Sequence, residues 1–143
     1  MKPPAAFIPL LLIFVVLSGC GGDREHPEVT TDSDRVMESY LTKVEKIGAM
    51  LAEVKNDSDA GAVSNQVLLV VQDMRELIPK MKEIDREQQA ETISKYRVRI
   101  NKVNEQFAKD ITHFVTIPGA SEDLIQQLKS LPPLIEDESG IKD

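Results

Sequence analysis

The sequence predicts an all-α protein, a small antiparallel bundle of three long helices followed by a short C-terminal helix. Apolar residues recur at steps of three and four over most of residues 32–134, which is the period of a helix with one buried face. Short turn-forming stretches at 56–59 and 118–119 separate these segments. Aromatic residues make up only 4% of the 143 residues, and there is no Trp. We therefore expect a core of Leu, Ile, Val and Met.

The first helix is expected to begin near Asp32 or Ser33, because either side chain can accept a hydrogen bond from a free amide of the first turn. It is expected to end near Lys55, before the turn at 56–59. Its apolar face is predicted to consist of Met37, Tyr40, Val44, Ile47, Leu51 and Val54.

The second helix has the most regular pattern, which runs without interruption from Val63 to Ile84. Its apolar face is predicted to contain Val63, Val67, Val70, Met74, Leu77, Met81 and Ile84. The apolar run 67–71 widens this face, so we expect it to be covered on two sides, by the short fourth helix or by a helix of a partner or second copy. A buried strand over 66–72 is the alternative, since β-branched residues favour strands.

The third helix is expected to start after Asp85, with Gln88 in a capping-box position, and to stop near Ile117 before Pro118. Its apolar face is predicted to contain Ile93, Tyr96, Ile100, Val103, Phe107 and Phe114. A short fourth helix follows from Ser121, with Leu124, Ile125, Leu128 and Leu131 on one face. Because the connecting turns are short, consecutive long helices should run up, down and up.

Composition excludes several classes of function. The net charge of −7 argues against nucleic acid as a partner, because phosphate binding requires a basic surface. A single cysteine excludes an internal disulfide framework and a cluster of cysteine metal ligands. The sequence contains no recognisable motif for catalysis, nucleotide binding or metal binding. We therefore expect no enzymatic activity, no cofactor and no metal site.

Two polar features of the third helix have alternative interpretations. Lys95, Arg99 and Lys102 share one face, which could hold an anionic partner, although a solvated face paired with neighbouring acids is favoured. Asp110 occupies a position where an apolar residue is due. It is expected either near a wet end of the bundle or buried with a cationic partner that fixes the helix register.

His113 is the most suggestive candidate ligand, because His and Met together can bind haem iron. A periplasmic ligand or haem carrier that uses the bundle interior is therefore the alternative function. Met37, Met50, Met74 and Met81 have the spacing of core residues, however, and His113 lies one position beside the apolar face. A partly exposed structural histidine is favoured, and His26 is interpreted as a solvated residue next to Pro27.

The N-terminus carries a localisation signal. After Met1 and Lys2, residues 5–17 contain no charge, and as a helix they would span roughly 20 Å against about 30 Å for a bilayer core. A charged start followed by a short apolar run is typical of a secretory signal. The residues that follow, Leu17-Ser18-Gly19-Cys20, resemble the lipobox of bacterial lipoprotein precursors.

The resemblance implies that Cys20 receives a diacylglycerol on its sulfur and becomes the first residue after cleavage. Residues 1–19 are then a signal peptide, 20–31 the lipidated cysteine and a flexible tether, 32–134 the bundle and 135–143 an acidic disordered tail. Gly21, in place of the Asp that retains enteric lipoproteins in the inner membrane, favours the outer membrane in a cell that has one.

The sequence as a whole predicts a lipid-anchored protein of the cell envelope that acts as a non-catalytic structural or protein-interaction module. The membrane is its expected partner through the lipid on Cys20. A second expected partner is an envelope protein, or another copy of the chain, bound through a helical face.

Overall fold

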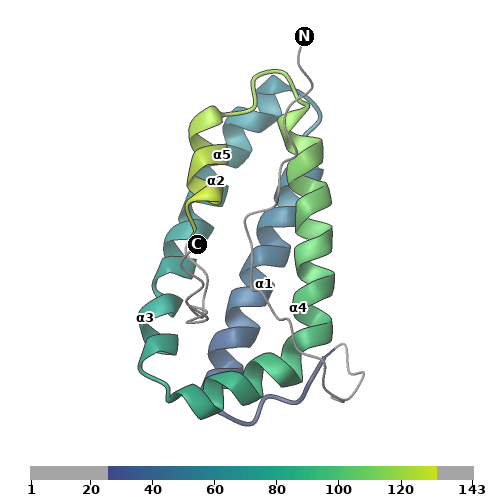
Figure 1. Cartoon of the computed structure of the whole chain (residues 1–143). Coiled ribbons are helices and arrows are strands. Elements are labelled where there is room, and N and C mark those ends of the chain that lie inside the picture. Colours follow the sequence, from purple (N-terminus) through teal and green to yellow (C-terminus); the bar gives the residue numbers. More distant parts are fainter. Residues whose placement is uncertain (1–25, 132–143) are drawn as a thin grey trace, which may run out of the picture.

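The computed structural model describes residues 26–131, which form five α-helices (Figure 1). In chain order these are α1 (Asp32–Ala52), α2 (Asp57–Arg75), α3 (Leu77–Lys82), α4 (Arg86–Val115) and α5 (Glu122–Lys129). The all-helical class is confirmed for this part of the chain. None of its helices is long and apolar enough to cross a membrane. The predicted signal peptide, Cys20 and the acidic tail lie outside the described residues.

The N-terminus of α1 is capped by Thr31, not by Asp32 or Ser33 as the sequence predicted. The Thr31 hydroxyl accepts a hydrogen bond from the Asp34 amide at 3.1 Å, and the Asp34 carboxylate accepts one from the Thr31 amide at 3.1 Å. This reciprocal pair satisfies two amides at once, which a single capping side chain cannot do. The predicted cap of α4 is confirmed, because Asp85 accepts a hydrogen bond from the Gln88 amide at 2.9 Å.

The long second helix expected from the sequence is two helices. α2 ends at Arg75 and α3 begins at Leu77, with Glu76 between them. Pro79 accounts for the break, because it has no amide hydrogen to donate to the Arg75 carbonyl four residues earlier, and its ring crowds that carbonyl. The apolar periodicity continues through the break, which is why the pattern alone concealed it.

α1 and α4 lie side by side and run in the same direction, whereas α2 and α3 run the opposite way (Figure 1). Two contacts fix this register. Near the start of both helices, the Lys95 ammonium lies 2.6 Å from the Asp34 carboxylate. Past the end of α1, the His113 ring lies 3.0 Å from the Val54 carbonyl. α1 therefore contacts α4 along its whole length.

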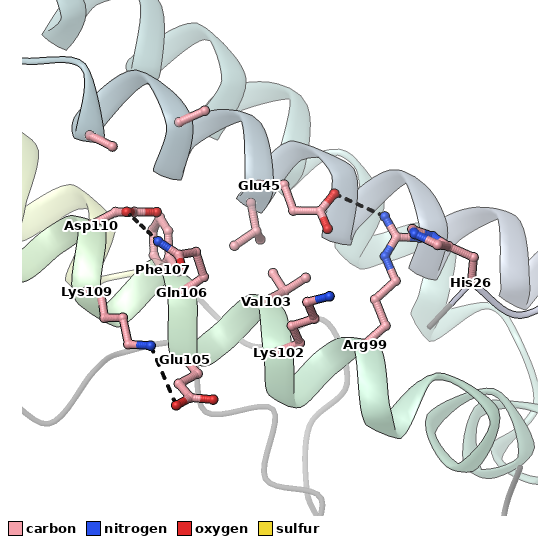
Figure 2. A pocket seen from close by; sticks show the side chains of 13 residues that line it. His26, Glu45, Arg99, Lys102, Val103, Glu105, Gln106, Phe107, Lys109 and Asp110 are labelled. Carbon is pink, nitrogen blue, oxygen red and sulfur yellow. Dashed lines mark hydrogen bonds and ion pairs between the residues drawn. The ribbon is translucent and has the colours of Figure 1, made fainter. Parts of the chain in front are cut away.

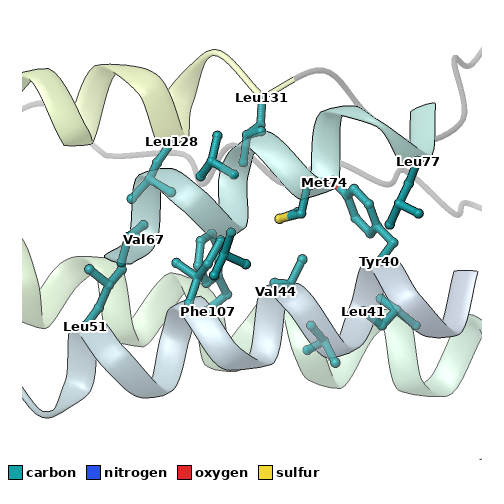
Figure 3. Close-up of a cluster of buried hydrophobic side chains, with 14 of the residues drawn as sticks. Tyr40, Leu41, Val44, Leu51, Val67, Met74, Leu77, Phe107, Leu128 and Leu131 are labelled. Carbon is teal, nitrogen blue, oxygen red and sulfur yellow. The ribbon is translucent and has the colours of Figure 1, made fainter. Parts of the chain in front are cut away.

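The core is aliphatic, as the composition indicated, and lies between α1, α2 with α3, and α4. The predicted helix over 66–72 is confirmed, and the alternative of a buried strand is excluded, because these residues belong to α2. Val67, Val70 and Val71 are buried, and Leu128 of α5 lies beside Val67 (Figure 3). α5 thus covers the wide apolar face of α2, and only Leu69, at 64% exposure, is left largely in solvent there.

Candidate functional site

A groove runs along α1 and α4, which we call the α1–α4 groove. It has a volume of about 530 Å³. Buried core residues form its floor, exposed Ala49 and Ala52 lie along α1, and charged or amide side chains of α4 lie opposite. Its lining consists of His26, Val44, Glu45, Ala49, Ala52, Arg99, Lys102, Val103, Glu105, Gln106, Phe107, Lys109 and Asp110. His26 and Arg99 lie at one end and Asp110 lies at the other (Figure 2).

Arg99 is the most deeply buried charge at the groove, with only 4% of its surface exposed. Its guanidinium donates to the Glu38 carboxylate and, at 3.1 Å, to the Glu45 carboxylate. Burial opposes the charge of Arg99, but the two carboxylates outweigh this effect and raise its pKa. We call Arg99, Glu38 and Glu45 the Arg99 cluster; it joins the two parallel helices across their exposed side.

The sequence favoured a solvated basic face, and this expectation is wrong for Arg99, which is buried. Lys95 and Arg99 do pair with acids, but these acids belong to α1 and not to neighbouring turns of the same helix. Arg99 is not a free anion-binding residue, because its Nη1 and Nη2 groups already bind the Glu38 and Glu45 carboxylates. A single-helix pattern shows which residues share a face but not what the face contacts.

A second buried charge fixes the chain just before α1. The Asp34 carboxylate accepts hydrogen bonds from the Thr30 amide at 2.9 Å, the Thr30 hydroxyl at 3.0 Å and the Thr31 amide at 3.1 Å. From α4, the Lys95 ammonium donates to it at 2.6 Å and the Thr92 hydroxyl at 3.4 Å. We call these five residues the Asp34 cluster. It binds the end of the predicted flexible tether to both long helices.

Burial by itself raises the pKa of Asp34, but the hydrogen bonds from Lys95, Thr30 and Thr31 outweigh it and lower the pKa to about 2. Next to this cluster, burial raises the pKa of the Tyr96 hydroxyl to about 12, and the negative charges of Glu38 and Asp34 add to the increase. Asp34 is therefore a carboxylate and Tyr96 a neutral phenol at neutral pH. Their roles are structural.

Asp110 lies at the far end of the groove and is only 8% exposed. It accepts a hydrogen bond from the Gln106 amide at 2.9 Å, so among residues 26–131 it is a buried carboxylate with a neutral partner, and the expected wet environment is wrong. The carboxylate fits because α1 has Gly48 opposite: a Cβ at residue 48 would come within 2.5 Å of the Asp110 Oδ2. Sequence reasoning missed Gly48, since only the register of the two helices relates it to Asp110.

This contact gives a double-mutant prediction. We expect Gly48→Ala to lower the free energy of unfolding by about 1–2 kcal/mol, because the new methyl group displaces a buried carboxylate. With Asp110→Ala already present, the same change should raise the free energy of unfolding by up to about 1 kcal/mol, since alanine favours a helix over glycine. Urea denaturation of the four proteins measures both effects.

Gly61→Ala is the matched control, because Gly61 also lies in a helix but no atom would lie within 4 Å of its new Cβ. It should stabilise the protein in either background. Equal effects of Gly48→Ala with and without Asp110 would show that the contact does not limit the packing of α1 on α4.

The candidate haem ligands of the sequence have ordinary structural positions. Met37, Met74 and Met81 are fully buried in the core, and Met50 is partly buried. His113 is exposed, and its Nε2 hydrogen-bonds the Val54 carbonyl just after α1. Within residues 26–131 no group of three or more His, Cys, Asp or Glu side chains is arranged to hold a metal.

The arrangement as a whole is suited to binding an extended chain: an apolar floor lies between an α1 wall of small and acidic residues and an α4 wall with alternating charges. Comparison with protein-family models, curated proteins and solved structures finds no match to this chain.

Proposed function

We propose that this chain is a lipid-anchored protein of the cell envelope whose helical bundle acts as a non-catalytic protein-interaction module. The observation that carries the proposal is the run Leu17-Ser18-Gly19-Cys20, in which the only cysteine of the chain follows a lipobox-like sequence after a short apolar segment. Two or more acyl chains hold a protein stably at a membrane. With Gly21 after the cysteine, the outer membrane is the proposed location in a cell that has one.

Contacts within the bundle, those of the Asp34 cluster, also support this proposal. A lipid anchor transmits any pull from the membrane to the first ordered residues of the domain. Here Thr30 and Thr31 are bound to Asp34 of α1, and Thr30 also accepts a hydrogen bond from Lys95 of α4 at 3.2 Å. The residues that precede α1 are thus bound to both α1 and α4.

The lipid is tested directly on the protein purified from membranes of a bacterial host. We expect mass spectrometry to find a chain that begins at Cys20 and carries diacylglycerol, with or without a further acyl group on the new amine. A radiolabelled fatty acid should be incorporated by the natural protein and not by a Cys20→Ser variant. A free thiol at Cys20 in the processed chain would overturn the proposal.

A matched pair of proteins separates the lipid from the leader, because an uncleaved apolar leader can itself retain a protein at the membrane. One protein of the pair has residues 1–19 replaced by an ordinary secretory leader and carries Cys20→Ser, so that its processed chain has no lipid; the other is the natural protein. We expect the first in the soluble periplasmic fraction, whereas the natural protein sediments with membranes. Sedimentation of the unlipidated chain would contradict an anchor at Cys20 alone.

A further inference from the structure

We propose that the α1–α4 groove is the docking site for residues 21–25 of this same chain, the segment between Cys20 and the first described residue. This inference extends the proposed function, and its consequence for membrane attachment depends on the lipid at Cys20. The docking itself does not depend on that lipid. The segment reads Gly-Gly-Asp-Arg-Glu.

The path of the chain before α1 points into the groove. Thr30 and Thr31 are held by the Asp34 cluster, level with Lys95 of α4. Traced backwards from there, Pro27 is buried and His26 lies among the residues that line the groove, at the same end as Arg99 (Figure 2). The chain therefore moves along α4 from Lys95 towards Arg99, and the next residues meet the rest of the groove.

The length of the segment matches the groove. From Arg99 to Asp110, α4 advances eleven residues, which is about 16 Å at the rise of an α-helix. Five residues in extended form cover about 17 Å. An extended chain from His26 would therefore place residue 21 close to Ala52 and Asp110, where the groove ends.

The chemistry of the segment also fits the walls. Gly21 and Gly22 have no side chains and suit the far half of the groove, where Ala49 and Ala52 of α1 are small. The α4 wall has Lys102, Glu105 and Lys109 in order, and the segment has Glu25, Arg24 and Asp23 in the same direction along the groove. Docking would add the charges of the segment to the exposed Lys109–Glu105 pair, which is 3.7 Å long, and would leave the Glu45–Arg99 pair as it is.

Docking changes where the anchor leaves the domain. A free tether would start at Thr31, near the beginning of α1. A docked segment delivers Cys20 to the opposite end of the groove, near Ala52 at the end of α1. The lipid would then hold the bundle with the α1 C-terminus towards the bilayer, and little free chain would separate the two.

Disulfide cross-linking tests the docking without lipid. The chain from residue 20 onwards is used with Cys20→Ser, since the described core lies entirely within residues 26–131. Gly22→Cys is combined with Ala49→Cys in the groove or, as the control, with Ala62→Cys, which is exposed on α2. We expect an intramolecular disulfide to form at least about tenfold faster with Cys at 49 than at 62, because docking raises the effective concentration of the two thiols.

Hydrogen exchange provides the second measurement, with no introduced cysteine. In the Cys20→Ser chain, the amides of residues 21–25 should exchange slowly. After the further change Ala49→Trp, which fills the groove, they should exchange at the rate of an unstructured peptide. Unchanged exchange in α2 shows that the variant is folded. Equal cross-linking at 49 and 62, or fast exchange of residues 21–25 before the Trp change, would overturn the proposal.

A disulfide between two chains would also overturn the proposal, since it would place the segment of a second copy in the groove. Because the tested chain carries no lipid, these results do not depend on whether mass spectrometry finds diacylglycerol on Cys20 of the natural protein. Docking without lipidation, or lipidation without docking, would each be seen separately.

Discussion

Replacing Arg99 by alanine is expected to lower the free energy of unfolding by about 3 kcal/mol. The guanidinium is almost completely buried and binds two carboxylates, Glu38 and Glu45, which belong to the other long helix. Without it, two like charges remain close together at the α1–α4 interface, and the buried stem of the arginine leaves a gap. The carboxylates are 34% and 46% exposed, so water compensates part of the loss and keeps it at the lower end of the range for buried pairs.

Arg35→Ala is the matched control. Arg35 also pairs with a carboxylate, that of Asp32 at 2.6 Å, but both side chains are more than 70% exposed. Exposed pairs contribute little, so this change should cost less than about 1 kcal/mol. Urea denaturation followed by circular dichroism compares the two variants. Equal losses would show that burial of Arg99 between the helices does not matter to stability.

A combined variant separates charge repulsion from loss of volume. Arg99→Met with Glu38→Gln and Glu45→Gln removes all three charges and keeps side chains of similar size. We expect it to recover much of the stability lost in Arg99→Ala, because no buried charge is then left without a partner.

Replacing Asp34 by asparagine is expected to have the second-largest effect, a loss of about 2 kcal/mol at neutral pH. The change leaves the Lys95 ammonium without its anion and removes a charged acceptor from the amides of Thr30 and Thr31. Asp32→Asn is the control, because this carboxylate lies in the same first turn of α1 but is exposed. It should cost less than about 1 kcal/mol.

The pH dependence identifies Asp34 as the cause. Its pKa is about 2 in the folded protein, against 3.8 without the surrounding structure, so the unfolded chain binds the proton more readily. The contribution of Asp34 is therefore complete above about pH 5 and is lost as the pH falls through about 2. Natural protein should lose about 2 kcal/mol more than Asp34→Asn over this range. Parallel pH profiles for the two proteins would contradict the role assigned to the Asp34 cluster.

Local features of the fold were predictable because they depend on neighbours in the chain. The period of apolar residues located the helices and most of the core, and the cap at Asp85 followed from the residue types that accept hydrogen bonds from free amides. The start of the short helix at Ser121 was also predicted. Pro79 was the missed local signal: its effect on the Arg75 carbonyl was readable in the sequence, but the continuing apolar pattern obscured it.

The candidate site was predictable only as a set of conspicuous residues. Lys95, Arg99 and Asp110 were identified as unusual charges on the third helix, but the sequence could not supply the residues that face them. Those residues lie about sixty positions earlier, on α1: Asp34 faces Lys95, Glu38 faces Arg99 and Gly48 faces Asp110. The offsets are 61, 61 and 62 positions, and they are nearly equal because α1 and α4 run parallel in one register.

The sequence by itself therefore determined the helical class, the aliphatic core and, by resemblance, the expected lipid site at Cys20. The tertiary structure alone decided that Arg99 and Asp34 are buried, that a glycine makes room for Asp110 and that Thr30 contacts both α1 and α4. The physical reason is the separation along the chain over which each kind of interaction acts. Helix formation and capping act over a few residues, whereas the rotation and register of two helices result from many weak contacts made at once between distant segments.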